Sequence, residues 1–127
     1  MPVRSLTSPV LAWPDRDSVD RSFRSWTKQA GNDRSDLLLA GYIGSYARGD
    51  WGVGSDLDVV LVIEASDLPF EKRGLEWDVS DLPVPTDLLV YTRSEWEALP
   101  RETRFARTLR DETVWVFAAP GMPRPDA

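Results

Sequence analysis

Gly44-Ser45 and Asp56-Leu57-Asp58, separated by ten residues, are the part of the chain best suited to chemistry. Glycine lets a backbone turn closely around a phosphate, and the serine after it offers an N–H and a hydroxyl as donors. Residues two apart in a strand point to the same side, so Asp56 and Asp58 would present two carboxylates together. The two motifs indicate a phosphate-binding turn beside a cation site, and therefore nucleotide chemistry.

The paired carboxylates need something that offsets their charge. At about 4 Å and an effective dielectric near 20, two like charges repel by about 4 kcal/mol. Mg²⁺ suits them because it prefers oxygen ligands and accepts one or two carboxylates together with phosphates and water. Asp87 begins a further apolar run and could reach the same point from a neighbouring strand. Three aspartates could hold two ions, which would activate an attacking oxygen and neutralise a leaving pyrophosphate.

The segment between the two motifs adds donors and small residues. Arg48 offers a guanidinium fork for a triphosphate, and Ser55 directly precedes the first aspartate of the pair. Gly49, Gly52 and Gly54 leave the entrance of the site free of side chains. Trp51 lies where it could stack on a base or a ribose.

Apolar runs on both sides of the motifs predict buried strands. Residues 37–43 and 57–63 are near-continuous apolar segments, as expected for strands covered on both faces. Residues 87–91 form a third run, and residues 113–117 predict a final short strand. The two motifs therefore occupy the loop between two buried strands and the start of the second one.

Helices are expected before, between and after these strands. Apolar residues at helical spacing predict a first helix over residues 17–31, with the glycine at its end as the stop. A short helix is expected around residues 70–77. Ser94 and Glu97 form a capping box that would open a last helix, which Pro100 should bend or split.

Composition limits the classes of function. The 127 residues suit one domain, and 15 Lys and Arg against 21 Asp and Glu give a net charge of −6. This balance makes nucleic-acid binding unlikely and favours a basic partner protein or a metal-bound nucleotide. The chain has neither Cys nor His, which excludes thiol nucleophiles, imidazole catalysis and Cys/His zinc sites. Any catalysis must use carboxylates, hydroxyls, Arg, Lys or a metal.

The chain divides into three expected parts. An extended lead-in over residues 1–16, which could pack through Leu11 and Trp13, precedes a domain over residues 17–118 and a flexible proline-rich tail over residues 119–127. No apolar stretch of 18 residues and no signal-peptide core are present. We therefore expect a cytoplasmic protein that makes no contact with membranes.

The order of strand, Gly-Ser, spacer with Arg-Gly, Ser-Asp-x-Asp, strand, and an Asp heading a third strand resembles the nucleotidyltransferase superfamily that includes DNA polymerase beta. It is most similar to the minimal nucleotidyltransferases, over about residues 17–118. The resemblance implies their α/β (α+β) fold, a mixed, mostly buried sheet with helices packed on it. The implied catalytic and metal-binding residues are Asp56, Asp58 and Asp87, and the implied nucleotide-binding residues are Gly44, Ser45, Arg48 and Ser55.

The same resemblance implies a function. Minimal nucleotidyltransferases are often antitoxins that transfer AMP from ATP to a tyrosine of a helical HEPN ribonuclease toxin. It therefore implies Mg²⁺-dependent transfer, with two ions, to a hydroxyl of a separate HEPN-type toxin, because the toxin's signature needs a histidine that this chain lacks. Two alternatives stay open. One is a small-molecule nucleotidyltransferase that works as a homodimer, and the other is a non-catalytic antitoxin that acts by binding alone.

Four arginines follow the last predicted helix as a stripe: Arg101, Arg104, Arg107 and Arg110. A solvated face is the favoured interpretation, and a docking surface for a toxin or a nucleic acid is the alternative. Tyr42 and Tyr46, near the Gly-Ser motif, are expected to serve packing, and self-modification by a nucleotide is the alternative.

Overall fold

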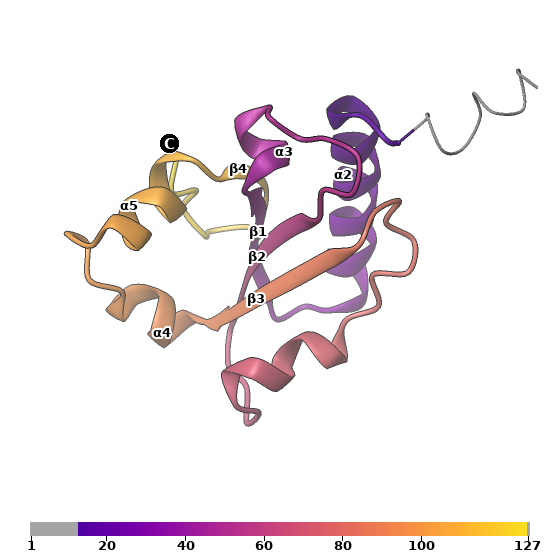
Figure 1. The fold of residues 1–127 in the computed structure, drawn as a ribbon. Helices are drawn as coiled ribbons and strands as arrows, with labels where there is room; N and C mark the ends of the chain where they lie inside the picture. Colours follow the sequence, from indigo (N-terminus) through magenta and orange to yellow (C-terminus); the bar gives the residue numbers. More distant parts are fainter. Residues whose placement is uncertain (1–12, 127) are drawn as a thin grey trace, which may run out of the picture.

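A four-stranded mixed sheet forms the centre of the protein, whose structure, a computed structural model, describes residues 13–126 (Figure 1). The strands are β1 (Leu37–Ile43), β2 (Leu57–Ile63), β3 (Thr86–Thr92) and β4 (Val114–Ala118), in the order β3-β2-β1-β4. β1 runs antiparallel to β2 and to β4, whereas β2 and β3 run parallel. The predicted α/β fold with a mixed sheet is confirmed, and every strand lies within one residue of its predicted bounds.

One face of the sheet is covered by α2 (Arg16–Asp33), which Figure 1 shows on the opposite side from α4 and α5. The helix begins at Asp15, whose side chain accepts a hydrogen bond of 2.8 Å from the backbone N–H of Ser18. Phe23 is fully buried and meets the ring of Tyr42 edge to face at 5.6 Å. No helix within residues 13–126 combines the length and the apolar character needed to cross a bilayer.

The predicted end of this helix is wrong. The helix continues through Gly31 to Asp33 and ends at Arg34, whose N–H bonds to the carbonyl of Ala30 at 2.8 Å. A Cβ added at Gly31 would lie 2.8 Å from the ring of Phe117 in β4. The glycine therefore allows close packing between helix and sheet and does not terminate the helix.

The other face is covered by α4 (Arg93–Ala98), α5 (Arg104–Asp111) and residues 119–126. The predicted break at Pro100 is confirmed, because it lies between the two helices. Leu109 and Trp115 are buried in this second cluster, and Met122 packs against it from the segment predicted to be a flexible tail. That segment thus contributes part of the cover on this face.

The predicted capping box is displaced by two residues. Thr92 is the N-cap of α4: its hydroxyl accepts from the N–H of Glu95, and the Glu95 carboxylate accepts from the N–H of Thr92. Ser94 and Glu97 have the same spacing, but β3 ends in an extended residue at Thr92, which sets the start of the helix. The spacing alone could not separate the two candidates.

Glu95 also receives a buried arginine. Arg73 lies in the 3₁₀ helix η1 (Phe70–Glu76), where a short helix was predicted, and its guanidinium donates to both Glu95 carboxylate oxygens at 2.6 and 2.9 Å. The same guanidinium donates to the carbonyls of Leu68 and Val90. This network ties η1, β3 and α4 together.

The N-terminal lead-in is described only from Trp13 onward, so Leu11 lies outside the described residues. The indole N–H of Trp13 donates to the hydroxyl of Tyr46 at 3.0 Å, and that hydroxyl donates to the carbonyl of Pro14 at 3.2 Å. The lead-in therefore contacts the segment that follows β1.

Replacing Glu95 by Gln should lower the free energy of unfolding by about 1–2 kcal/mol, because it leaves the buried guanidinium of Arg73 without a carboxylate. The loss is smaller than for a fully buried ion pair, because the Glu95 side chain is partly exposed. Hydrogen bonds from Arg73 above all hold the pKa of Glu95 at about 2. The stabilisation is therefore complete above the unfolded-state pKa and is lost as the pH falls toward 2. Urea unfolding at pH 7 and pH 3 measures both effects. Glu97→Gln, on the same helix, is the control and should change neither the free energy of unfolding nor its dependence on pH. An equal loss of stability in both variants would refute the role of the Arg73–Glu95 pair.

Candidate functional site

The three predicted acidic residues lie at one edge of the sheet. Ile43 at the end of β1 pairs with Asp58, and Asp58 pairs with Asp87 at the start of β3. Neighbouring strands are about 4.8 Å apart, so Asp58 and Asp87 are adjacent on parallel strands at the same level. Asp56 lies just before β2 and two residues from Asp58.

Strand alternation places Asp58 and Asp87 on the same face. In β2, Leu57 and Val59 belong to the cluster under α2, whereas Val60 belongs to the cluster under α4 and α5. Asp58 shares the face of Val60, and Asp87 shares that of Leu89, which also packs on the second cluster. The two carboxylates therefore project from the face that carries α4 and α5.

The carboxylates affect one another electrostatically. Asp58 is half-buried, while Asp56 and Asp87 are exposed. Burial raises the pKa of the Asp58 carboxyl, the negative charges of Asp87 and Asp56 raise it further, and Arg48 opposes them. The site thus concentrates negative charge at Asp58 and would bind a proton or a cation there more readily than an isolated aspartate.

In the observed side-chain conformations, the acidic residues do not form a complete metal site. Across residues 13–126, no group of three acidic side chains is gathered closely enough to hold a metal ion. Carboxylates repel one another, so a spread arrangement is the expected one for the side chains by themselves. The register brings Asp58 and Asp87 together, and the roles of all three as ligands stay predictions.

Gly44 is the point of closest approach to the acidic residues. It adopts φ +82° and ψ −153° between β1 and the short helix α3 (Ser45–Arg48). A Cβ at this position would lie 2.5 Å from Oδ2 of Asp58, well inside van der Waals contact. Both the backbone conformation and the nearby carboxylate therefore require glycine, and Ser45 begins the helical turn directly beside Asp58.

The remaining predicted nucleotide contacts are Arg48, the last residue of α3, and Ser55 in the loop that follows. Arg48 is exposed and its Nε donates to Asp50 at 3.1 Å. The Ser55 hydroxyl accepts from the N–H of Gly52 at 2.8 Å and so shapes the loop before Asp56. Sequence reasoning missed Asp50, although its position two residues after Arg48 was a visible signal for an ion pair.

Aromatic residues near the site face the other side of the sheet. Trp51 stacks on Tyr46 at 5.8 Å and 7° and packs against the cluster under α2, so this ring contact accounts for its position. Tyr42 donates to Asp20 at 2.7 Å, and burial with that hydrogen bond raises the pKa of Tyr42 to about 12. The prediction that Tyr42 and Tyr46 serve packing is confirmed.

Gly44→Ala should lower the free energy of unfolding by about 1–3 kcal/mol, because the new methyl group meets Asp58 and the positive φ is unfavourable. Gly52→Ala is the matched control, since Gly52 has open space around it and no positive φ. It should leave stability unchanged or raise it by up to about 1 kcal/mol. Urea unfolding measures both, and equal stabilities would contradict the close approach.

Asp87→Asn should lower the pKa of Asp58, because after burial the charge of Asp87 contributes most to raising that pKa. Carboxyl-carbon NMR titration measures the change directly. Asp33→Asn, at the far end of α2, serves as the control and should leave the Asp58 titration unaltered. An unchanged Asp58 pKa in the Asp87 variant would show that the two carboxylates do not interact.

Comparison with known proteins agrees with this geometry. Residues 31–116 match the family described as nucleotidyltransferase domain. A crystal structure from Sulfolobus solfataricus, provisionally assigned as a nucleotidyltransferase, has 16% identity and a TM-score of 0.60, covering 84% of this chain and 86% of that one. A chain from a crystal structure of a toxin–antitoxin with AMP-PNP has 14% identity and a TM-score of 0.53, covering 76% and 73%. No curated protein sequence matches the chain. The two structural likenesses show a shared fold. Because the family match spans more than half of the chain, this protein belongs to the nucleotidyltransferase domain family.

Proposed function

We propose that the protein transfers AMP from ATP to a tyrosine hydroxyl of a separate HEPN-type toxin, with Mg²⁺ as cofactor, and thereby acts as an antitoxin. The observation that carries the proposal is the register that sets Asp58 beside Asp87, with Gly44 directly against Asp58. Membership of the nucleotidyltransferase domain family supports the reaction class. The likeness to a chain from a toxin–antitoxin structure with AMP-PNP supports the donor and the biological setting.

Asp56, Asp58 and Asp87 are the proposed Mg²⁺ ligands and catalytic residues. Their oxygen donors match the preference of Mg²⁺, and the raised pKa of Asp58 indicates a position where a cation would relieve repulsion. Bound there, Mg²⁺ would activate the attacking hydroxyl and neutralise the leaving pyrophosphate. Asp56 and Asp87 are exposed, so small rotations of their side chains would bring them toward Asp58.

The proposed nucleotide-binding residues lie between β1 and β2: Gly44, Ser45, Arg48 and Ser55. Gly44 lets the backbone approach the phosphates, and Ser45 offers its N–H and its hydroxyl. Arg48 would exchange its exposed contact with Asp50 for a phosphate oxygen. Ser55 would keep the loop before Asp56 in shape through its bond to Gly52.

The acceptor is proposed to come from another molecule. The chain has three tyrosines, Tyr42, Tyr46 and Tyr91, and none is more than 9% exposed. Self-modification would therefore require local unfolding. The exposed positions of Asp56 and Asp87 leave the acidic site open to a partner's side chain.

Asp58→Asn should abolish AMP transfer while the fold is retained, because it removes an anionic ligand at nearly constant volume. The test incubates the purified protein with Mg²⁺ and α-labelled ATP, alone and with the product of the adjacent gene, and follows the added AMP by mass spectrometry. Asp50→Asn is a matched control outside the proposed ligand set and should still transfer. An AMP adduct on a partner tyrosine, lost only in the Asp58 variant, is the expected result.

Other outcomes would favour the alternatives. Full activity of Asp58→Asn would refute the proposed mechanism. Binding of ATP without an adduct on the partner would favour a small-molecule acceptor. Neutralisation of the partner by Asp58→Asn as effectively as by the unmodified protein would favour an antitoxin that acts by binding alone.

A further inference from the structure

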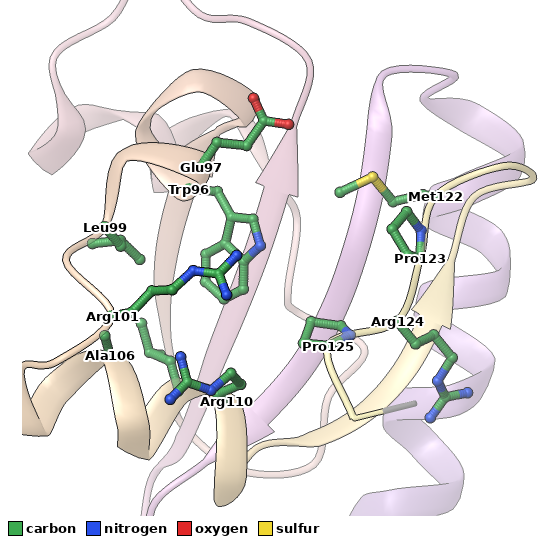
Figure 2. A pocket seen from close by; sticks show the side chains of 11 residues that line it. Trp96, Glu97, Leu99, Arg101, Ala106, Arg110, Met122, Pro123, Arg124 and Pro125 are labelled. Carbon is green, nitrogen blue, oxygen red and sulfur yellow. The ribbon is translucent and has the colours of Figure 1, made fainter.

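A hollow lies on the face that carries α4 and α5. It is bounded by α4, α5 and residues 122–125, and has a volume of about 360 Å³ (Figure 2). None of the three proposed catalytic aspartates lines it. The nucleotidyl-transfer proposal therefore gives this hollow no role.

The floor and sides of the hollow are mainly apolar. Trp96, Leu99 and Met122 line it and are only half-buried, so part of each side chain stays accessible. Trp96 is held in place by Trp115, which its ring meets edge to face at 5.6 Å. A rigid indole at the wall suits a flat apolar ligand better than a hydrated ion.

Two arginines give the hollow a positive charge. Arg101 and Arg110 both line the hollow, and in Figure 2 their guanidinium groups lie on the same side of it, with the carboxylate of Glu97 pointing away from them. Within residues 13–126, no carboxylate lies at ion-pair distance from Arg101, and Arg110 has only Asp111 at 3.9 Å. Two positive charges that line one hollow repel each other, and a bound anion would relieve that repulsion.

The third arginine at the hollow is already engaged. Arg124 donates to the carbonyl of Trp115 at 2.6 Å and to Asp126 at 3.2 Å. Its guanidinium points away from Arg101 in Figure 2. Arg124 thus fixes the segment that closes the hollow and leaves Arg101 and Arg110 as the anion-binding pair.

We propose that this hollow binds a small organic anion, with its aromatic or aliphatic part against Trp96 and Leu99 and its carboxylate, phosphate or sulfonate between Arg101 and Arg110. The volume is at the small end of ligand pockets, which span about 300–1,000 Å³, and suits a compact ligand with one or two rings. The protein has a net charge of −6, so local arginines are needed for an anion to bind at all.

The probe for the test is 1-anilinonaphthalene-8-sulfonate, which combines two aromatic groups with one sulfonate and becomes fluorescent in apolar sites. The full chain should bind it saturably with one molecule per protein. Arg101→Gln and Arg110→Gln should each weaken binding by about tenfold, because each removes a charge-assisted contact. Arg21→Gln, an exposed arginine on α2, should leave the affinity unchanged. Equal thermal unfolding midpoints would establish that all three variants are folded.

Three further measurements locate the ligand and define its chemistry. The indole NMR signal of Trp96, assigned with Trp96→Phe, should shift on binding. Phenyl phosphate should displace the probe, whereas inorganic phosphate and the uncharged N-phenyl-1-naphthylamine should not. Asp58→Asn should bind the probe normally and Mg-ATP should not displace it, so this result is independent of the nucleotidyl-transfer proposal.

Several outcomes would overturn the proposal. Absence of binding, or accumulation of many probe molecules without saturation, would exclude a defined site. Affinity that is unaffected by both arginine substitutions would exclude the anion-binding pair. Displacement by Mg-ATP would place the probe in the nucleotide site, and displacement by inorganic phosphate at equal concentration would show that the apolar part of the ligand contributes nothing.

Discussion

The register of β2 between its two neighbours is the constraint on which the rest of the site depends. Asp58 faces α4 and α5 only because Val59 and Leu61 are buried under α2 on the opposite side. A slip of one residue would move every side chain of β2 to the other face and would bury Asp58 under α2. The packing that stabilises the sheet therefore also holds Asp58 beside Asp87, where burial first and then repulsion from Asp87 raise the pKa of Asp58.

The turn after β1 depends on packing on the far side of the sheet. α3 has four residues, too few for a helix to be stable by itself. Tyr46 within it is fully buried, receives a hydrogen bond from Trp13 and stacks on Trp51. These contacts hold the turn from the side of α2, while Gly44 lies against Asp58 on the other side. The aromatic cluster under α2 thus supports the turn that is proposed to bind the triphosphate.

The strands and the spacing of the acidic motif could be predicted from the sequence because both depend on local patterns. Continuous apolar runs identify buried strands, and Asp-x-Asp places two carboxylates on one side of a strand. Predictions failed at positions whose role is set by a contact with a residue far away in the sequence. Gly31 is a packing residue because of Phe117, and the start of α4 is set by the end of β3 and by Glu95, which Arg73 holds.

The two faces of the sheet differ in the charged groups that they carry. α2 closes its face with an aromatic core, whereas α4, α5 and residues 119–126 leave both the aspartates and the arginine-lined hollow on the other. Negative charge gathers at Asp58 and positive charge at Arg101 and Arg110. Charges in water are screened over about 8–10 Å at physiological salt, so each group can act on its own ligand within one acidic protein. Every tyrosine of the chain is buried, so under the proposed function the acceptor tyrosine would belong to another molecule and would reach Asp58 on this same face, which carries side chains of both signs.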